Sequence, residues 1–232
     1  MTQIKVCGLR PGDDLSFVAQ SAVSHVGVVF VPSSKRYVEP RQAARITTAV
    51  GQNARIIGVF SDFRVDDILR ALEESKAHGA QLHGNESVAV CDELRRHGFT
   101  VWKALRITSE MTGKQVFEAA VQYVGVANAL LFDAAPPAGV DHTVTGGHGV
   151  PFDWKVLQSI DGYAKQQHIN LPPLWVAGGL NSENVAQLLQ TVQPFGVDVS
   201  SGVETAARKD PQRIEAFIKA VQPDDSSLPI PN

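Results

Sequence analysis

The sequence predicts an α/β protein that folds as a single (β/α)8 TIM barrel over residues 1–222, with a flexible C-terminal tail at 223–232. Short segments rich in β-branched residues alternate with segments of helical spacing, which is typical of βαβ units around a parallel sheet. The length of 232 residues suits eight such units in one domain. A doubly wound open sheet is the alternative, but CGLRPGDD lacks the G-x-G-x-x-G pattern usual after its first strand.

Eight apolar segments have the length and composition of buried strands. In chain order they are IKVCG (4–8), HVGVVFV (25–31), ARIIGVF (54–60), GAQLH (79–83), TVWKALRI (100–107), ALLFDA (129–134), LWVAGG (174–179) and GVDVSSG (196–202). Between them, helical spacing is clearest at 65–79, 183–192 and 211–221. Residues typical of helix boundaries mark the expected starts and ends: Pro40, Ser87, Ser109 and Asn181 at starts, Gly79 and Gly98 at ends.

Two segments interrupt this alternation. Residues 135–151 form a long connection rich in proline and glycine after the sixth predicted strand. Connections of this length in a compact domain are usually functional lids or disordered, so we expect one or the other here. The tail at 223–232 has no apolar periodicity, and we expect it to be a frayed end.

Composition excludes several functional classes. A net charge of −3 gives the chain no general attraction for nucleic acid or for anionic membranes. Two cysteines without a CxxC pattern argue against a disulfide framework and a zinc site, and no metal is expected. The N-terminus does not resemble a signal peptide, and no apolar run could span a bilayer, so we expect a cytoplasmic protein.

Polar side chains occur near the C-terminal ends of several predicted strands. Side chains alternate along a strand, so Lys5 and Cys7 are expected to face the barrel axis while Ile4 and Val6 face the helices. The same alternation brings together further polar groups: Gln81, His83, Asp133, Asp198 and Ser200. Each residue alone fits a simpler role, since Cys7 could be a small core residue and Asp133 a turn residue. Together they indicate a catalytic site, because such sites lie at this end of the barrel.

The last two loops predict a phosphate site. VAGGLN (176–181) supplies Gly178 and Gly179, and VDVSSGVE (197–204) supplies Ser200, Ser201 and Gly202. Glycine lets backbone amides approach an anion closely, and serine hydroxyls add donors. The loops after strands 7 and 8 commonly bind phosphate in this fold, so a phosphorylated small molecule is the expected substrate.

A set of motifs resembles one family over residues 4 to about 218. The motifs KVCGLR, SKRYV, AQLHGNE, LLFDA, GGHGVPFDW, VAGGLN and DVSSGVE are similar, in this order, to those of phosphoribosylanthranilate isomerase of tryptophan biosynthesis. The resemblance implies a (β/α)8 barrel that needs no cofactor. It would carry out the Amadori rearrangement of N-(5′-phosphoribosyl)anthranilate to 1-(2-carboxyphenylamino)-1-deoxyribulose 5-phosphate.

The resemblance also implies roles for individual residues. Cys7 would be the general base and Asp133 the general acid, while Arg36 would hold the anthranilate carboxylate. Lys5, His83 and Asp198 would line the substrate pocket, and we expect Lys5 to help lower the pKa of Cys7. No partner other than this substrate is expected, and the chain could be a monomer or a homodimer.

Some residues depart from the family pattern, and other functions stay open. The connection at 135–151 is unusually long, Val150 stands where a lysine is common, and TAARKD (205–210) lacks the usual glycine. Ribulose-phosphate epimerases need a metal-ligand set that is not evident. Indole-glycerol-phosphate synthase uses lysine and glutamate chemistry, for which Lys103 is suggestive without a matching glutamate. A non-catalytic barrel that binds a phosphorylated metabolite is the alternative of a different class.

Overall fold

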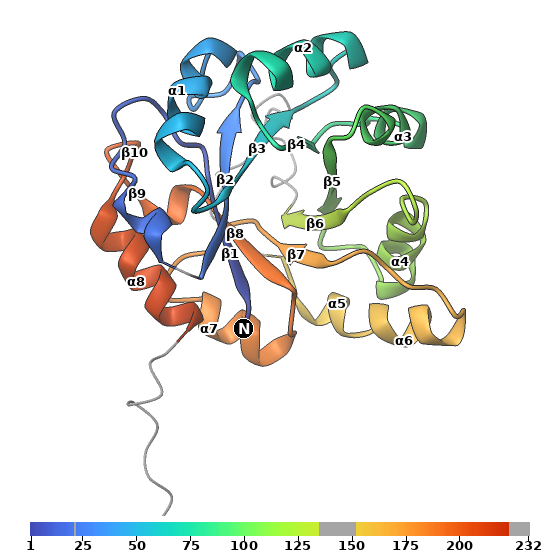
Figure 1. Ribbon diagram of the computed structural model, residues 1–232. Coiled ribbons are helices and arrows are strands. Elements are labelled where there is room, and N and C mark those ends of the chain that lie inside the picture. The colour runs from blue at the N-terminus through green and yellow to red at the C-terminus, as the bar shows by residue number, and fades with distance from the viewer. Residues whose placement is uncertain (21, 135–151, 223–232) are drawn as a thin grey trace, which may run out of the picture.

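A computed structural model describes residues 1–20, 22–134 and 152–222 and confirms the predicted barrel (Figure 1). Eight strands close into one parallel barrel, each paired with its neighbours in chain order and the last with the first. The strands are β1 (Gln3–Cys7), β2 (Val23–Val29), β3 (Arg55–Phe60), β4 (Gly79–Leu82), β5 (Thr100–Ile107), β6 (Ala129–Ala134), β7 (Leu174–Val176) and β8 (Gly196–Val199). The doubly wound alternative is therefore wrong.

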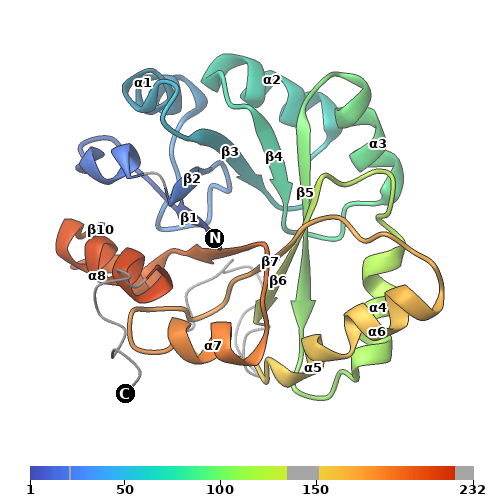
Figure 2. The ribbon, with the colours of Figure 1, turned by 60° about the horizontal axis from the view of Figure 1, so that its bottom comes forward.

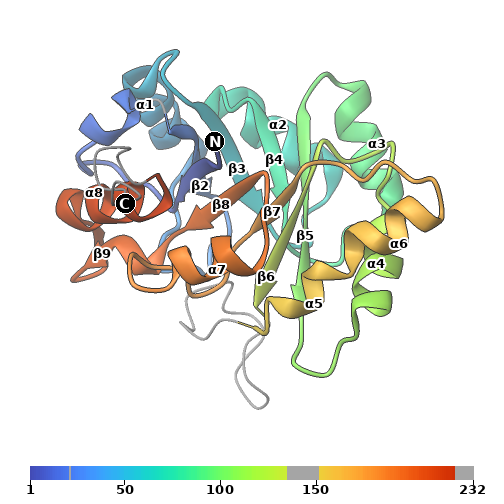
Figure 3. The same ribbon diagram turned by 90° about the horizontal axis from the view of Figure 1, so that it is seen from below.

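Helices form an outer ring around the strands (Figure 2). The α-helices are α1 (Pro40–Val50), α2 (Val65–Ser75), α3 (Val88–Arg96), α4 (Gly113–Val121), α5 (Lys155–Gln158), α6 (Ile160–Gln166), α7 (Val185–Thr191) and α8 (Pro211–Val221). The connection after β1 contains only a 3-10 turn, η1 (Ser16–Ala19), which packs against α8 and β2 and completes the ring there. Figure 3 shows α4, α5 and α6 together on one side of the barrel and α8 on the opposite side.

Several helix boundaries differ from the prediction. The helix expected at 65–79 stops at Ser75, because Lys76 adopts a left-handed conformation with a φ of 55° that ends it. Gly79 consequently begins β4. The capping box of α4 is formed by Thr112 rather than Ser109, and α7 starts at Val185, after a turn closed by the Asn181 side chain. The expected helix at 211–221 matches α8.

The barrel interior has an apolar floor beneath a polar upper layer. Residues facing the helices, such as Ile4 and Val6, belong to the large outer core, as strand alternation predicts. A smaller cluster fills the interior with Trp102, Trp175 and Leu131 among its members. The two indole rings lie 4.5 Å apart between centroids, and His25 packs against both. These aromatic side chains fill the barrel interior near the N-terminal ends of the strands.

The chain after β8 forms a small antiparallel hairpin. A 3-10 turn, η2 (Ser201–Val203), leads into β9 (Glu204–Thr205), which pairs with β10 (Arg208–Lys209). The two turn residues, Ala206 and Ala207, both have positive φ angles, 47° and 58°. Two-residue hairpin turns of this kind favour asparagine and glycine, because a Cβ atom is strained in the left-handed region. The absence of glycine in TAARKD therefore places strain in this hairpin.

Relieving the strain is expected to stabilise the barrel. The double change Ala206→Asn and Ala207→Gly should raise the free energy of unfolding by about 1 kcal/mol. For a chain of this size this corresponds to a rise in Tm of about 2–4 °C, measurable by thermal denaturation followed by circular dichroism. Ala49→Gly, in the exposed right-handed backbone of α1, is the matched control and should lower Tm. An unchanged or lower Tm of the double variant would contradict this account.

Candidate active site

A pocket opens at the C-terminal ends of the strands. Most of the residues predicted for the site line it: Cys7, Arg36, His83, Asp133, Gly178, Gly179, Asp198, Ser200 and Ser201. Lys5 and Gly202 do not reach its surface. Lys5 lies beneath the pocket and is fully buried. The structure thus brings together side chains from β1, β4, β6 and β8, as the strand alternation predicts.

A continuous chain of hydrogen bonds crosses the floor of this pocket. The Lys5 Nζ atom donates to Asp198 Oδ2 at 3.0 Å and to Gln81 Oε1 at 2.9 Å. Gln81 Nε2 lies 3.0 Å from His83 Nδ1, and His83 Nε2 lies 2.9 Å from Asp133 Oδ2. All five side chains are buried, so these polar groups depend on one another for partners. The alternation of side chains along the strand predicted that Gln81 faces the barrel interior, but no role in the site was predicted for it.

Cys7 lies in a small apolar cluster at the mouth of the barrel. The cluster contains Val29 and Val59, and a Cβ atom at Gly27 on the adjacent strand would lie 2.6 Å from the sulfur. Burial raises the pKa of the Cys7 thiol above its ordinary value, and the positive charges of Lys5 and Lys209 offset this effect only in part. Lys5 lowers the pKa of Cys7 as expected, but desolvation outweighs its charge, so the expected net fall of this pKa toward the working pH is wrong.

The raised pKa predicts how Cys7 reacts with an alkylating agent. In a Cys91→Ala background, the rate of reaction with iodoacetamide should follow the thiolate and keep rising above pH ~8.5, the pKa of an ordinary cysteine. Removing Cys91 isolates the signal, although burial already raises the pKa of that thiol to about 11. A pH profile measured by mass spectrometry that levels off below about pH 8 would contradict this prediction.

Two carboxylates face the pocket from strands that are separated only by β7. Asp133 lies on β6 and Asp198 on β8, and both are buried. A Cβ atom at Gly178 would lie 2.9 Å from Asp133 Oδ1, so the glycine allows the loop after β7 to pass beside this carboxylate. Asp198 Oδ1 is buried without a hydrogen-bond partner among the described residues. An unpaired carboxylate oxygen beside a pocket is suited to accept a hydrogen bond from a ligand.

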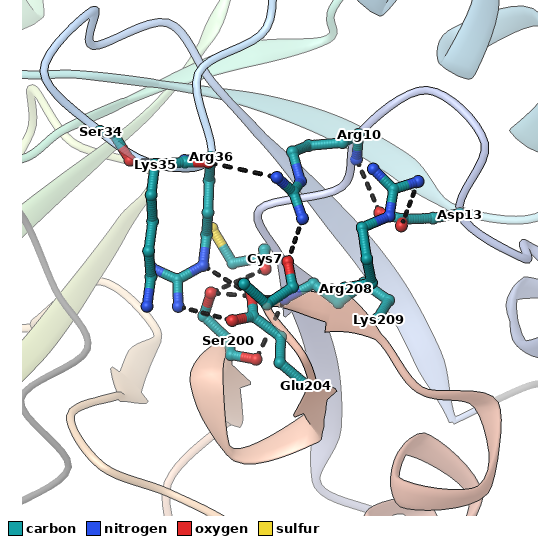
Figure 4. Close-up of polar contacts among 11 residues, drawn as sticks. Cys7, Arg10, Asp13, Ser34, Lys35, Arg36, Ser200, Glu204, Arg208 and Lys209 are labelled. Atoms are coloured by element: carbon teal, nitrogen blue, oxygen red, sulfur yellow. Dashed lines mark hydrogen bonds and ion pairs between the residues drawn. The ribbon is translucent and has the colours of Figure 1, made fainter.

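Arg36 reaches the pocket from the loop between β2 and α1 and is held by Glu204 (Figure 4). Arg36 Nε and Nη2 lie 2.6 Å and 2.9 Å from the two Glu204 oxygens, and Lys209 Nζ lies 2.8 Å from Oε1. Although burial alone would raise the pKa of the Glu204 carboxyl, the bonds and charges of Arg36 and Lys209 lower it to about 2. Neither Glu204 nor Lys209 was predicted as a site residue, and the only sequence signal for Glu204 was its place in DVSSGVE.

The guanidinium of Arg36 keeps one edge available. Glu204 occupies the edge formed by Nε and Nη2, while Nη1 donates to no acceptor in the part of the chain that the structure describes. The strained hairpin carries both Glu204 and Lys209. Two contacts attach it to the loop after β1 (Figure 4): Arg10 donates a hydrogen bond to the carbonyl oxygen of Ala207, and Arg208 lies 2.9 Å from the Asp13 carboxylate. The hairpin therefore determines where Arg36 points.

The two loops predicted to bind phosphate lie against each other. A Cβ atom at Gly202 would overlap the carbonyl oxygen of Leu180, so the loops after β7 and β8 approach as closely as backbones can. The amide groups of Gly178, Gly179 and Leu180 donate to no acceptor within the described ranges. Ser200 Oγ donates to Cys7 O at 2.9 Å, so its hydroxyl proton is already used. The free amides, rather than Ser200, are the donors available for an anion.

Lys103 lies outside the barrel interior. Its neighbours Trp102 and Ala104 pack into the interior, so Lys103 points toward the helices. Its Nζ atom lies 2.8 Å from Glu86 Oε2 and donates to the carbonyl oxygens of Leu82 and Gly84. This buried Lys103–Glu86 pair stabilises the loop after β4 and does not line the pocket. Lys103 therefore gives no support to the indole-glycerol-phosphate synthase alternative.

Comparison with known proteins decides the family. A family model described as N-(5′-phosphoribosyl)anthranilate (PRA) isomerase matches residues 4–220. The chain belongs to this family. The N-(5′-phosphoribosyl)anthranilate isomerase of Chelativorans sp. (strain BNC1) is 36% identical, over 94% of this chain and 95% of that protein. The chain is therefore an isomerase of the PRA isomerase family.

Solved structures agree with this assignment. Phosphoribosyl anthranilate isomerase from Thermotoga maritima matches with a TM-score of 0.78 and 33% identity, covering 95% of this chain and 98% of that one. A phosphoribosyl anthranilate isomerase in complex with reduced 1-(o-carboxyphenylamino)-1-deoxyribulose 5-phosphate matches with a TM-score of 0.75 and 30% identity over the same shares.

The remaining expectations concern metals, membranes and the long connection. Within 1–20, 22–134 and 152–222, no three His, Cys, Asp or Glu side chains are arranged to hold a metal ion. No helix in these ranges has the length and apolarity to cross a membrane. The expectations for 135–151, for Val150 and for the tail at 223–232 lie outside the described residues.

Proposed function

We propose that the chain catalyses the Amadori rearrangement of N-(5′-phosphoribosyl)anthranilate to 1-(2-carboxyphenylamino)-1-deoxyribulose 5-phosphate. The observation that carries this proposal is that Cys7 and Asp133 line one pocket, from β1 and β6, next to the loop after β7, whose backbone amides donate to no acceptor among the described residues. A base and an acid on different walls of one pocket can act on the two sides of a sugar bound between them. Family membership supports the choice of substrate.

The chemistry assigns one proton transfer to each group. Asp133 would donate a proton to the ribose ring oxygen, so that the bond from this oxygen to C1′ breaks and a Schiff base with the anthranilate nitrogen forms. The Schiff base acidifies the hydrogen on C2′, which the Cys7 thiolate would remove to give the enolamine. Tautomerisation of the enolamine gives the ketose product. General acid–base catalysis of this kind contributes ~10²–10⁴-fold for each group.

Other lining residues would hold the substrate. The free edge of Arg36 suits the anthranilate carboxylate, while Glu204 occupies the opposite edge. The unpaired Asp198 Oδ1 suits a ribose hydroxyl, and Lys5 would keep this carboxylate oriented. Burial raises the pKa of Asp198, and the charge of Lys5 opposes this rise. The amides of Gly178, Gly179 and Leu180 suit the phosphate, and Ser201 lines the pocket beside them from the next loop, where Gly202 allows the two loops to approach closely.

The expected partner is this small phosphorylated substrate. A related structure describes monomers of a dimeric phosphoribosylanthranilate isomerase from Thermotoga maritima, at 30% identity. For this chain, monomer and homodimer both stay predictions, and so does a cytoplasmic location.

The decisive experiment is to generate the substrate in situ and follow the loss of its anthranilate fluorescence. Rapid loss on addition of the chain, with formation of the ketose product by chromatography, is the expected result. Binding of a reduced product analogue without any turnover would overturn the proposal and favour the non-catalytic phosphosugar-binding barrel.

A further inference from the structure

Gln81 occupies a position in the hydrogen-bond chain that the reaction itself does not use. Its side chain is buried at 1% exposure and lies between Lys5 and His83. We propose that Gln81 is a positioning residue that holds His83 in the tautomer with its proton on Nε2, and thereby selects which oxygen of Asp133 carries the acid proton. The catalytic part of this proposal rests on the proposed function, whereas the tautomer does not.

The orientation of the Gln81 amide follows from Lys5. An ammonium group can only donate hydrogen bonds, so the atom 2.9 Å from Lys5 Nζ has to be the amide oxygen. Asp198, 3.0 Å from the same Nζ, balances the charge of Lys5 and keeps it in place. The amide nitrogen therefore faces His83 Nδ1 at 3.0 Å and donates to it.

The amide in turn determines the state of the imidazole. Because Nδ1 accepts from Gln81, it carries no proton, and the single proton of the neutral ring lies on Nε2. If the imidazole were protonated, the N–H on Nδ1 would face the N–H of the Gln81 amide, and two donors would repel each other. If the Gln81 amide were turned over, its NH₂ group would face the Lys5 ammonium, which is also only a donor. The hydrogen bonds from Lys5 to Asp198 and to Gln81 consequently exclude both the protonated ring and the turned amide.

The consequence for Asp133 concerns its two oxygens. His83 Nε2 donates to Oδ2 at 2.9 Å, so Oδ2 acts as an acceptor. The acid proton is then carried by Oδ1, the oxygen beside Gly178 on the side of the phosphate loops. With the opposite tautomer, Oδ2 would have to donate its own proton to His83, and that proton would point away from the sugar. Gln81 thus acts on the acid through His83.

Two isosteric variants test the proposal. Gln81→Glu places an acceptor against Nδ1 and should move the proton of His83 onto Nδ1, whereas Gln81→Met removes the bond and should give mixed tautomers. Nitrogen-15 NMR of the histidine rings reads the tautomer directly, with the His83 signals assigned by their loss in His83→Asn. In the unchanged chain, Nδ1 should show the shift of an unprotonated nitrogen and Nε2 that of a protonated one.

The kinetic expectation separates positioning from binding. Gln81→Glu should lower kcat by about 10–100-fold, the size of effect seen when the partner that orients a metal-bound histidine is lost, while KM for the phosphoribosyl substrate stays nearly unchanged. Gln42→Glu, on the exposed face of α1, adds the same charge and should alter neither kcat nor the tautomer. If Gln81 only stabilises the fold, its replacement would lower Tm but would leave the His83 NMR signals of the folded protein unchanged.

Each outcome bears on the proposal. Protonated Nδ1 in the unchanged chain would overturn it, and so would a Gln81→Glu variant with unchanged tautomer and kcat. If Gln81→Glu does not fold, Gln81→Met and the unchanged chain still decide the tautomer. Should the unchanged chain show the Nε2–H tautomer but no isomerase turnover, the proposed function would fail while the tautomer assignment would stand.

Discussion

Cys7→Ala is expected to lower kcat by about 10²–10⁴-fold, the contribution of a general base, and to leave the barrel folded. The thiol is the only group on β1 that faces the pocket, and alanine cannot accept a proton. The fold should persist, because the change removes one sulfur atom from a small cluster at the rim and leaves the main core untouched. Loss of anthranilate fluorescence and circular dichroism measure the two parts of this expectation.

Cys91→Ala is the matched control for this variant. Cys91 is fully buried on α3, on the helix side of the barrel, and does not line the pocket. Its replacement should lower stability without reducing kcat. If Cys7→Ala turned over substrate at nearly the rate of the unchanged chain, the assignment of the base would be wrong.

Asp133→Asn is expected to lower kcat to a similar extent, about 10²–10⁴-fold. Asparagine keeps the shape of the side chain and can still accept a hydrogen bond from His83 Nε2 through its oxygen. It has no acidic proton for the ribose ring oxygen, so ring opening should become the slow step. A product analogue should bind nearly as well as to the unchanged chain, which isothermal calorimetry can measure.

Asp161→Asn, in the first turn of α6 outside the pocket, controls for the loss of one negative charge. It should retain full activity. Strong loss of analogue binding by Asp133→Asn, with kcat unchanged at saturating substrate, would show that Asp133 binds the substrate without acting as its acid.

The positions of Cys7 and Asp133, the proposed base and acid, were predictable because they depend on strand parity. In IKVCG, the apolar residues Ile4 and Val6 pack outward, so Lys5 and Cys7 have to point inward. The same reasoning placed Asp133 and Asp198, and the parallel order of the strands brought their ends to one pocket.

Other parts of the site depend on partners that lie far apart in the chain. Glu204 and Arg36 are separated by 168 residues, and neither motif alone indicates that they form a bidentate pair. The direction of the Cys7 pKa shift was mispredicted for the same reason, since burial depends on how Val29 and Val59 pack around the thiol.

The sequence by itself determined the barrel, the inward residues of each strand and the family, because these depend on periodicity and on short motifs. Only the tertiary structure decided the direction of the Cys7 pKa shift, the pairing of Arg36 and the link from Lys5 through Gln81 to Asp133. These features arise from desolvation and from hydrogen bonds between distant strands, whose strength depends on distances that no local pattern encodes.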